Sequence, residues 1–326
     1  GQTLQAKDVR GTLRLGGHIG WLRWSQPGFS LEARAVDLAW TLPAVLQRQL
    51  QLTQFDVAEM TVVDEPSVAT AARAVAPAQL RWPVTVEVPF SVARLRYAGT
   101  TQLLLTELAG HYVFDSYKHR LYKGKGQISS GKYEFSAELE AQGALALMLQ
   151  VQGLVDATLP ASHQRLRVAA QAQLAGTLAG PDAALTLQAT LQPELPSART
   201  ERSRAMQATL TAHIKPWQAQ PLTQLNAQWQ ALNLAPLWPQ APQTQLAGTL
   251  SVLPRNAAWQ GQLSLSNALA GPLNQQRLPV QSLQATLGYG QGKWGLTALR
   301  ARVGAGSVSG SGQFQDGQWQ GSFDLA

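Results

Sequence analysis

Apolar and polar side chains alternate along much of this chain with a period of two. From 84 to 92 most alternate residues are apolar, and the alternation recurs at 133–139, 145–151, 184–192 and 261–268. This period is typical of β-strands that bury one face. The apolar positions of interest in the first four stretches are Val84, Val86, Val88, Phe90, Val92, Tyr133, Phe135, Leu139, Leu145, Leu147, Leu149, Val151, Leu185 and Leu187.

Helical periodicity is confined to two short stretches, 42–50 and 67–76. Between the strands, Gly, Asn, Asp and Pro stand at intervals near those of an all-β meander, and strand–helix–strand alternation is missing. We therefore predict an all-β fold, with many short strands and a few short helical turns. The expected divisions are a strand and short-helix unit at 1–65, a Pro/Ala-rich linker at 66–83, a sheet segment at 84–192, a polar loop at 193–204 and a second sheet segment at 205–326.

The segment GKGQISSGKYEF (124–135) nearly spells the nucleotide-binding pattern G-x-x-x-x-G-K-[ST]. Gly126, Gly131 and Lys132 match it, but Tyr133 stands where Ser or Thr would bind magnesium. A true phosphate loop opens a helix, whereas Lys132 enters an alternating stretch. The sequence therefore predicts a turn followed by a strand.

The 326 residues suffice for one large domain or two ordinary ones, and only 14% are charged. Cysteine is absent, which excludes disulfides and thiolate chemistry. The sequence contains neither a signal-peptide pattern nor a run of eighteen apolar residues, and both ends fall within the strand pattern. We expect a piece of a longer protein. The net charge is +7, and the two basic clusters, 117–126 and 199–204, are expected to be solvated loops or a surface for acidic lipid headgroups.

No catalytic, metal-binding or cofactor-binding constellation stands out. The five histidines lack a second His or carboxylate at metal-ligand spacing, and the pair Asp64 and Glu65 precedes a proline in an expected loop. Val308 occupies the centre of the only window at 304–312 that is spaced like G-x-S-x-G. We expect no enzyme, no metal and no cofactor. Basic–aromatic signatures are also missing, which argues against a nucleic-acid partner.

Ten tryptophans are spread over most of the chain. They could fill the core and the strand ends, or they could line a surface for lipid or sugar. Two interpretations are likewise open for the apolar faces listed above: they could line a groove, or they could pack against each other in a closed sandwich.

Four phrases, taken in order, resemble the TamB family of AsmA-like envelope proteins. Residues 4–24 resemble its N-terminal strand, Gly-rich turn and strand that closes on an aromatic residue. Residues 31–66 resemble the continuation, in which a strand ending at Trp40 leads into a helical turn and two more strands. The phrase at 83–97 follows a Pro/Ala linker, and the phrase at 229–252 resembles the family's recurrent strand, proline-bracketed turn and strand.

The resemblance implies an elongated, twisted, taco-like sheet with an apolar concave groove, in the N-terminal part of a periplasmic protein. It implies that phospholipid is carried towards the outer membrane. Such proteins are anchored in the inner membrane by a helix, and their C-terminal end contacts an outer-membrane Omp85-class barrel, TamA; neither end is recognisable here. The apolar positions listed above are then the groove-lining candidates.

Physical chemistry agrees with that interpretation, because an apolar sheet face open to water is an aggregation hazard unless something covers it. Acyl chains would cover it, at about 0.8 kcal/mol per buried CH₂. Two other classes remain open. A carbohydrate-binding β-solenoid would use Trp side chains as sugar platforms, and a membrane barrel would need regular strands with aromatic girdles.

Overall fold

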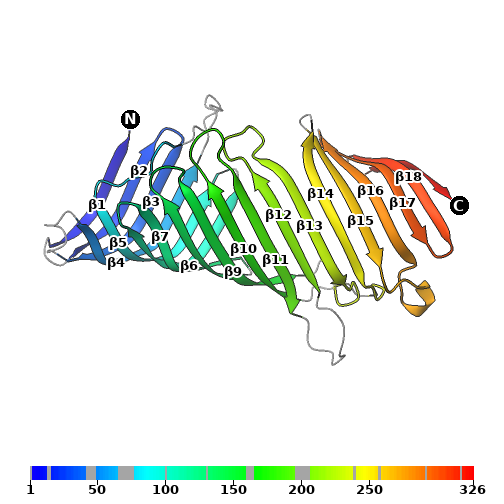
Figure 1. Ribbon diagram of the computed structural model, residues 1–326. Helices are drawn as coiled ribbons and strands as arrows, with labels where there is room; N and C mark the ends of the chain where they lie inside the picture. Colours follow the sequence, from blue (N-terminus) through cyan, green and yellow to red (C-terminus); the bar gives the residue numbers. More distant parts are fainter. Residues whose placement is uncertain are drawn as a thin grey trace. The chain divides into compact units, whose positions relative to one another are not determined.

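The protein is built almost entirely of β-strands, which confirms the predicted all-β class (Figure 1). Among the described residues, no helix has the length and apolar character needed to cross a membrane. The computed structural model describes residues 2–12, 16–41, 49–64, 77–99, 101–129, 131–158, 165–194, 206–237, 240–255, 258–290, 292–315 and 318–326.

Strands that are consecutive in the chain are hydrogen-bonded neighbours in a 19-stranded sheet. Pairing is antiparallel along β1–β8 and β12–β19, except that β4 and β5 run parallel. The strands are β1 Thr3–Thr12, β2 Gly16–Gln26, β3 Phe29–Trp40, β4 Gln49–Asp64, β5 Thr85–Ala98, β6 Gln102–Phe114, β7 Lys118–Ile128, β8 Gly131–Glu140, β9 Ala146–Thr158, β10 Arg165–Thr177, β11 Leu185–Glu194, β12 Gln207–Ile214, β13 Leu222–Leu232, β14 Leu246–Arg255, β15 Ala258–Asn267, β16 Val280–Gly290, β17 Lys293–Val303, β18 Gly306–Gln315 and β19 Gln318–Leu325, with one 3₁₀ turn at Leu273–Gln275.

The chain forms two compact units. Strands β1–β8 belong to the first unit and β12–β19 to the second, whereas β9, β10 and β11 contribute residues to both. The expected linker at 66–83 does not end the sheet, because β4 before it pairs with β5 after it. The first unit comprises Gly1–Leu154, Gln173–Leu185 and Pro216–Ala219, and the second comprises Val155–Ala172, Thr186–Lys215 and Gln220–Ala326.

Each of the alternating stretches in the sequence lies largely or wholly within a strand. They fall in β5, β8, β9, β11 and β15, as predicted. Lys132 lies in β8 directly after a turn, so the segment resembling a phosphate loop is a hairpin connection. The helix expected at 67–76 and most of the one expected at 42–50 lie outside the described residues, as does the cluster 199–204; Gln49 and Leu50 begin β4.

Two local predictions are wrong. The basic stretch 117–126, predicted as a solvated loop, lies almost entirely in strand β7. Backbone pairing with β6 and β8 places the stretch in the sheet, where Lys118 and Arg120 also reach Glu138 on β8. The stretch after the expected helical turn was predicted to form two strands, but it forms the single strand β4.

A line of kinks crosses the strands of the first unit, including the long strand β4. At this kink line one residue in each strand drops out of the pairing, while the register continues unchanged on either side. The residues of the kink line are Asp8, Gly20, Ala35, Ala58, Ala93 and Glu107.

The kink line offsets the side-chain alternation by one residue. Asp8, Ala35 and Glu107 adopt a left-handed backbone with φ of 54°, 48° and 53°. Apolar residues on the same face are therefore three apart across the line, as Val57 and Met60 are. No strand gains an extra residue here; the left-handed residues themselves shift the alternation.

The first unit contains two clusters of buried apolar side chains. One is centred on Ala33, Val36, Val57 and Val92, all at most 3% exposed, which come from β3, β4 and β5. The other consists of Val86, Phe114 and Ala141. Partly buried side chains extend them: Ile19, Leu22, Leu31, Leu38, Phe55, Met60, Leu95 and Leu108 for the first cluster, and Val84, Val88 and Tyr112 for the second.

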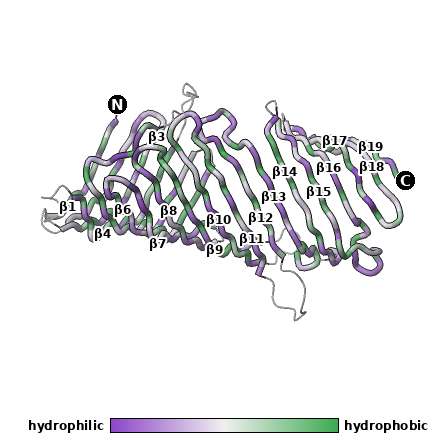
Figure 2. Tube along the Cα trace, in the orientation of Figure 1, coloured by the Kyte–Doolittle hydropathy of each residue, from purple (hydrophilic) through white to green (hydrophobic). Residues whose placement is uncertain are grey.

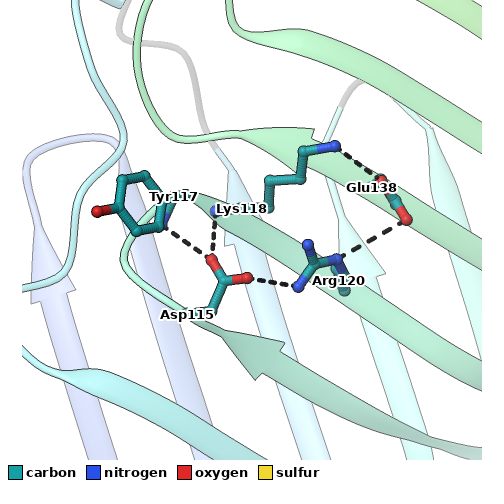
Figure 3. A network of polar contacts seen from close by, with 5 residues as sticks. All are labelled: Asp115, Tyr117, Lys118, Arg120 and Glu138. Carbon is teal, nitrogen blue, oxygen red and sulfur yellow. Dashed lines mark hydrogen bonds and ion pairs between the residues drawn. The ribbon is translucent and has the colours of Figure 1, made fainter.

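A polar network closes the turn between β6 and β7 (Figure 3). One Asp115 carboxylate oxygen accepts hydrogen bonds from the backbone N–H groups of Tyr117 and Lys118, at 2.9 and 2.8 Å. The other oxygen accepts a hydrogen bond from the Arg120 guanidinium at 2.5 Å. The backbone donors and Arg120 together lower the pKa of Asp115 to about 2.

We expect Asp115→Asn to destabilise the protein at neutral pH and to make its stability less sensitive to acid. Because the pKa is lower in the folded than in the unfolded state, the carboxylate stabilises the fold above about pH 4, and this contribution is lost as the pH falls towards 2. The side chain is 37% exposed, so screening limits the loss to about 1 kcal/mol. Urea unfolding between pH 2 and 7 measures it.

The matched control is Asp324→Asn, which removes an exposed carboxylate on β19. Its unfolding curve should follow that of the unmodified protein. Equal pH profiles for Asp115→Asn and the unmodified protein would show that the network in Figure 3 does not stabilise the turn.

Candidate functional site

The second unit presents a continuous apolar face across β12–β19. Its residues stand directly opposite one another in neighbouring strands, so that they form rows perpendicular to the strands. A central row is Leu210, Ala227, Leu250, Leu263 and Ala285. A second row is Ala212, Leu225, Val252, Gly261, Leu287 and Leu296, and a third is Ala208, Trp229, Gly248, Leu265, Leu283, Ala301, Val308 and Leu325.

This apolar face is only half-buried. Leu210, Leu250, Leu263 and Leu265 are of intermediate exposure, and Leu325 is 81% exposed. Both clusters of buried core residues found in the described parts of the chain lie in the first unit. A face packed under a second layer would be buried well below this level, so the apolar face of β12–β19 is open.

The opposite face of β12–β15 is polar, and Arg255 at the end of β14 contacts Gln260 on it. Figure 2 shows hydrophilic and hydrophobic positions alternating along the strands. The polar face carries a shallow hollow of about 510 Å³. Its polar lining includes Gln207, Thr209, Gln228, Gln230, Thr249 and Ser264, and its described lining contains no charged side chain.

An aromatic row borders the apolar face near the hairpin turns that join β14 to β15, β16 to β17 and β18 to β19. Trp259, Tyr289, Trp294 and Phe314 follow one another in cross-strand register, and the next partner in β19 is Trp319. Tyr289 and Trp294 contact each other with ring centroids 4.6 Å apart, and Trp294 is 52% exposed.

Glycines make room for other aromatic side chains in both units. A Cβ on Gly248 would fall on the Trp229 ring, one on Gly310 would lie 2.5 Å from Phe323, and one on Gly124 would fall on Phe135. Such pairs let a large ring lie flat over the neighbouring strand. Gly124, at the start of the segment resembling a phosphate loop, therefore serves aromatic packing.

The candidate residues predicted from the sequence divide into buried and half-buried sets. Val92 and Val86 belong to the buried clusters of the first unit. Leu145 is 0% exposed and precedes β9 with a left-handed φ of 49°, so it does not share the strand alternation of Leu147. Leu185 is also buried; the half-buried set is Val84, Val88, Phe90, Tyr133, Phe135, Leu139, Leu147, Leu149, Val151 and Leu187.

Sequence reasoning missed the larger surface. No residue after Leu187 was predicted to line the site, although the alternation at 261–268 lies largely within β15. The sequence of 243–252 also closely repeats that of 171–180. It also missed Leu95 and Leu108, because the kink line breaks the period of two just before each of them.

The outer face of β2–β6 is charged. Arg94 and Glu59 pair across β5 and β4 at 2.9 Å, and Ser91 donates to Asp56 at 2.5 Å. A hydrogen bond from Trp21, assisted by Arg34, lowers the pKa of Glu32. Within the part of the chain that the structure describes, no three His, Asp or Glu side chains are grouped as a metal site would require.

The described histidines lie in strands and hold neighbouring groups. His18 contacts Asp37 at 2.7 Å, and His111 contacts Glu87 at 3.2 Å. His119 stacks on Phe114 with centroids 4.5 Å apart and contacts the Tyr112 hydroxyl at 2.7 Å. These contacts tie strands together, as does the contact of His213 with the Thr186 hydroxyl at 3.4 Å.

The comparisons with known proteins do not assign this chain to a family. No family model, curated protein or solved structure matches it.

We expect Gly248→Ala to destabilise the protein by about 1–3 kcal/mol, because the added methyl group collides with Trp229 and with the Ser264 carbonyl oxygen. The control is Gly288→Ala on β16, where the nearest atom to an added Cβ is 3.9 Å away. That change should be neutral or slightly stabilising. Urea unfolding of both variants measures the difference, and equal curves would contradict close packing of Trp229 over Gly248.

Proposed function

We propose that this chain is a segment of a lipid-transfer protein of the TamB type, which shields phospholipid acyl chains between the inner and outer membranes. The observation that carries the proposal is the open apolar face of β12–β19. Its leucines stand in unbroken cross-strand rows and remain half-exposed. A monomeric soluble protein rarely leaves such a surface uncovered unless it binds something apolar.

Hydrocarbon chains suit this surface chemically. The rows consist mainly of Leu, Ala, Val and Gly, which offer contact without hydrogen bonds. Each buried CH₂ contributes about 0.8 kcal/mol, so one acyl chain gains several kcal/mol from partial burial. Because this attraction is non-directional, a chain can slide along the rows without breaking specific bonds. The role requires no catalytic group, metal or cofactor.

The half-buried residues of the first unit extend the proposal to β5, β8 and β9. Lipid would contact the half-exposed apolar side chains of these strands, such as Phe90, Tyr133 and Leu147. The buried side chains of Val92 and Leu145 stabilise the core instead. Periplasmic location, attachment to the inner membrane and contact with an Omp85-class barrel such as TamA belong to the proposal through the family resemblance.

A second candidate function is carbohydrate binding, and the aromatic row favours it. Tyr289, Trp294 and Phe314 are 38%, 52% and 41% exposed and stand side by side in register. Exposed rings in a row could stack on sugar faces. This alternative predicts binding at one border, without lipid on the leucine rows.

The decisive variant is Leu263→Arg, at the centre of the leucine rows between Leu250 and Ala285. We expect the unmodified protein, purified without detergent, to carry phospholipid in near-stoichiometric amount. The arginine places a charge among acyl chains and should remove at least half of that lipid. Mass spectrometry of organic extracts measures the amount per mole of protein.

The matched control is Gln262→Arg, which adds the same charge at the adjacent exposed position on the polar face. It should leave lipid content unchanged, and circular dichroism should show equal strand content for both variants. A lipid-free unmodified protein that binds oligosaccharide would replace the proposal with the carbohydrate alternative.

A further inference from the structure

We propose that the polar face of β12–β17 binds an acidic oligosaccharide. The site is a row of exposed polar side chains that stand opposite one another in successive strands, called here the polar row. It lies on the face opposite the leucine rows, so the inference goes beyond the proposed lipid function and does not depend on it. The polar row consists of Thr209, Gln228, Thr249, Ser264, Gln284 and Arg300.

The polar row crosses all the strands from β12 to β17. At a spacing of about 4.8 Å between neighbouring strands, it is roughly 24 Å long. Its first four members line the hollow of about 510 Å³ on this face. Gln284 continues the row from Ser264 to Arg300. The row therefore joins a shallow depression to a charged side chain without a break.

The side chains of the polar row have free hydrogen-bonding groups. Within the described parts of the chain, none of them takes part in a hydrogen bond or an ion pair with another protein group. In the neighbouring row, by contrast, Gln230 donates a hydrogen bond to Gln207 at 3.1 Å. Amide and hydroxyl side chains offer both donors and acceptors. They match the hydroxyl groups of a sugar, which also donate and accept.

The charge on this face is positive. The described strands β12–β19 carry four basic residues and one acidic residue, all at positions of the polar face. Two of the basic residues, Arg300 and Arg302, are neighbours on one face of β17, about 7 Å apart along the strand. Among the described residues neither forms an ion pair. The five charged residues are Arg255, Lys293, Arg300, Arg302 and Asp324.

A carboxylate on the sugar chain would complement this arginine pair. The guanidinium group binds carboxylates through two parallel hydrogen bonds, and these charge-assisted bonds are stronger than neutral ones. An acidic sugar chain therefore matches both parts of the row, with hydroxyl groups over the Gln, Thr and Ser side chains and a carboxylate at Arg300.

Other anionic partners fit this face less well. The main-chain groups of a sheet interior are paired between strands, so an extended peptide lying on the face would find no partners for its own N–H and C=O groups. Extended peptides add to sheet edges instead. Anionic membranes attract clusters of about four to eight cations, whereas this face has two adjacent arginines beside a run of neutral side chains.

The test measures binding of hexagalacturonate and of its methyl ester by isothermal titration calorimetry at low salt. The two ligands have the same sugar chain, but the ester carries no charge. We expect the unmodified protein to bind the acid roughly tenfold more tightly than the ester, because hydrogen bonds to charged groups are stronger. This preference should shrink in 0.5 M NaCl.

Arg300→Gln/Arg302→Gln should remove the preference and leave binding of the ester unchanged. The matched control is Arg255→Gln/Lys293→Gln, which removes the same charge from the same face at the strand ends. Lys293 is roughly 20 Å from Arg300 along β17, so the control should keep the preference. Equal loss in both double variants would show that only the net charge matters, and it would overturn the site.

Gln228→Ala/Gln284→Ala tests the neutral part of the row. Both positions are exposed, and removing two amide groups should weaken binding of the acid and of the ester by the same factor, roughly tenfold. Circular dichroism should show equal strand content in all these variants. Unchanged binding of both ligands would overturn the placement of the site in the polar row.

Two further ligands distinguish other occupants. Tighter binding of poly-glutamate or of phosphatidylglycerol vesicles, lost in Arg300→Gln/Arg302→Gln, would overturn the inference in favour of an acidic peptide or a membrane surface. If the unmodified protein binds neither hexagalacturonate nor its ester, the inference is overturned and the proposed function stands, because the acyl chains would lie on the opposite face. Leu263→Arg, in turn, should reduce the lipid content without changing sugar binding.

Discussion

Apolar side chains must stay on one face along every strand and across every neighbouring strand, and both units depend on that constraint. A slip of one residue between two strands would turn a whole set of leucines to the opposite face. In the second unit Leu250 stands opposite Leu263, and Leu263 opposite Ala285. Because each partner in these rows is itself apolar, the register that forms the sheet is also the register that assembles the face.

The two units satisfy this constraint, but they differ in how far their apolar side chains are buried. In the first unit the kink line bends the strands, and side chains on both sides of it converge into the cluster around Val36 and Val57. In the second unit aromatic rings pack against glycines of neighbouring strands, as Trp229 does against Gly248, and few side chains are fully buried. Burial of small and branched side chains stabilises the first unit, whereas the apolar face of the second remains available to a ligand.

The strands could be predicted from the sequence because alternation is local information, and β5, β8 and β9 lie where it predicted them. Pairing between strands depends on residues far apart in the sequence, which the period of two does not report. It therefore did not predict that the basic stretch 117–126 forms β7, where Lys118 pairs with Glu138 of β8. The repeated phrase QLAGTL shows the same limit, since it ends β10 but begins β14. The sequence predicted that apolar strand faces form the candidate site, but it did not predict which residues are exposed on them. Leu145 and Leu147 look equivalent in sequence, yet the left-handed backbone at Leu145 places that side chain in the core.

The proposed role explains why one face of β12–β15 carries apolar rows and the other carries polar side chains. A groove that moves lipid should hold acyl chains by many weak contacts, since one strong polar bond would trap the cargo. The leucine rows meet that requirement, and the polar face presents Gln, Thr and Ser side chains around its hollow. Arg255 and Lys293, at the strand ends, occupy positions of the polar face, so no charge enters the apolar surface there. Holding acyl chains weakly is compatible with movement along the sheet, because neighbouring strands offer similar apolar side chains at successive positions of the rows.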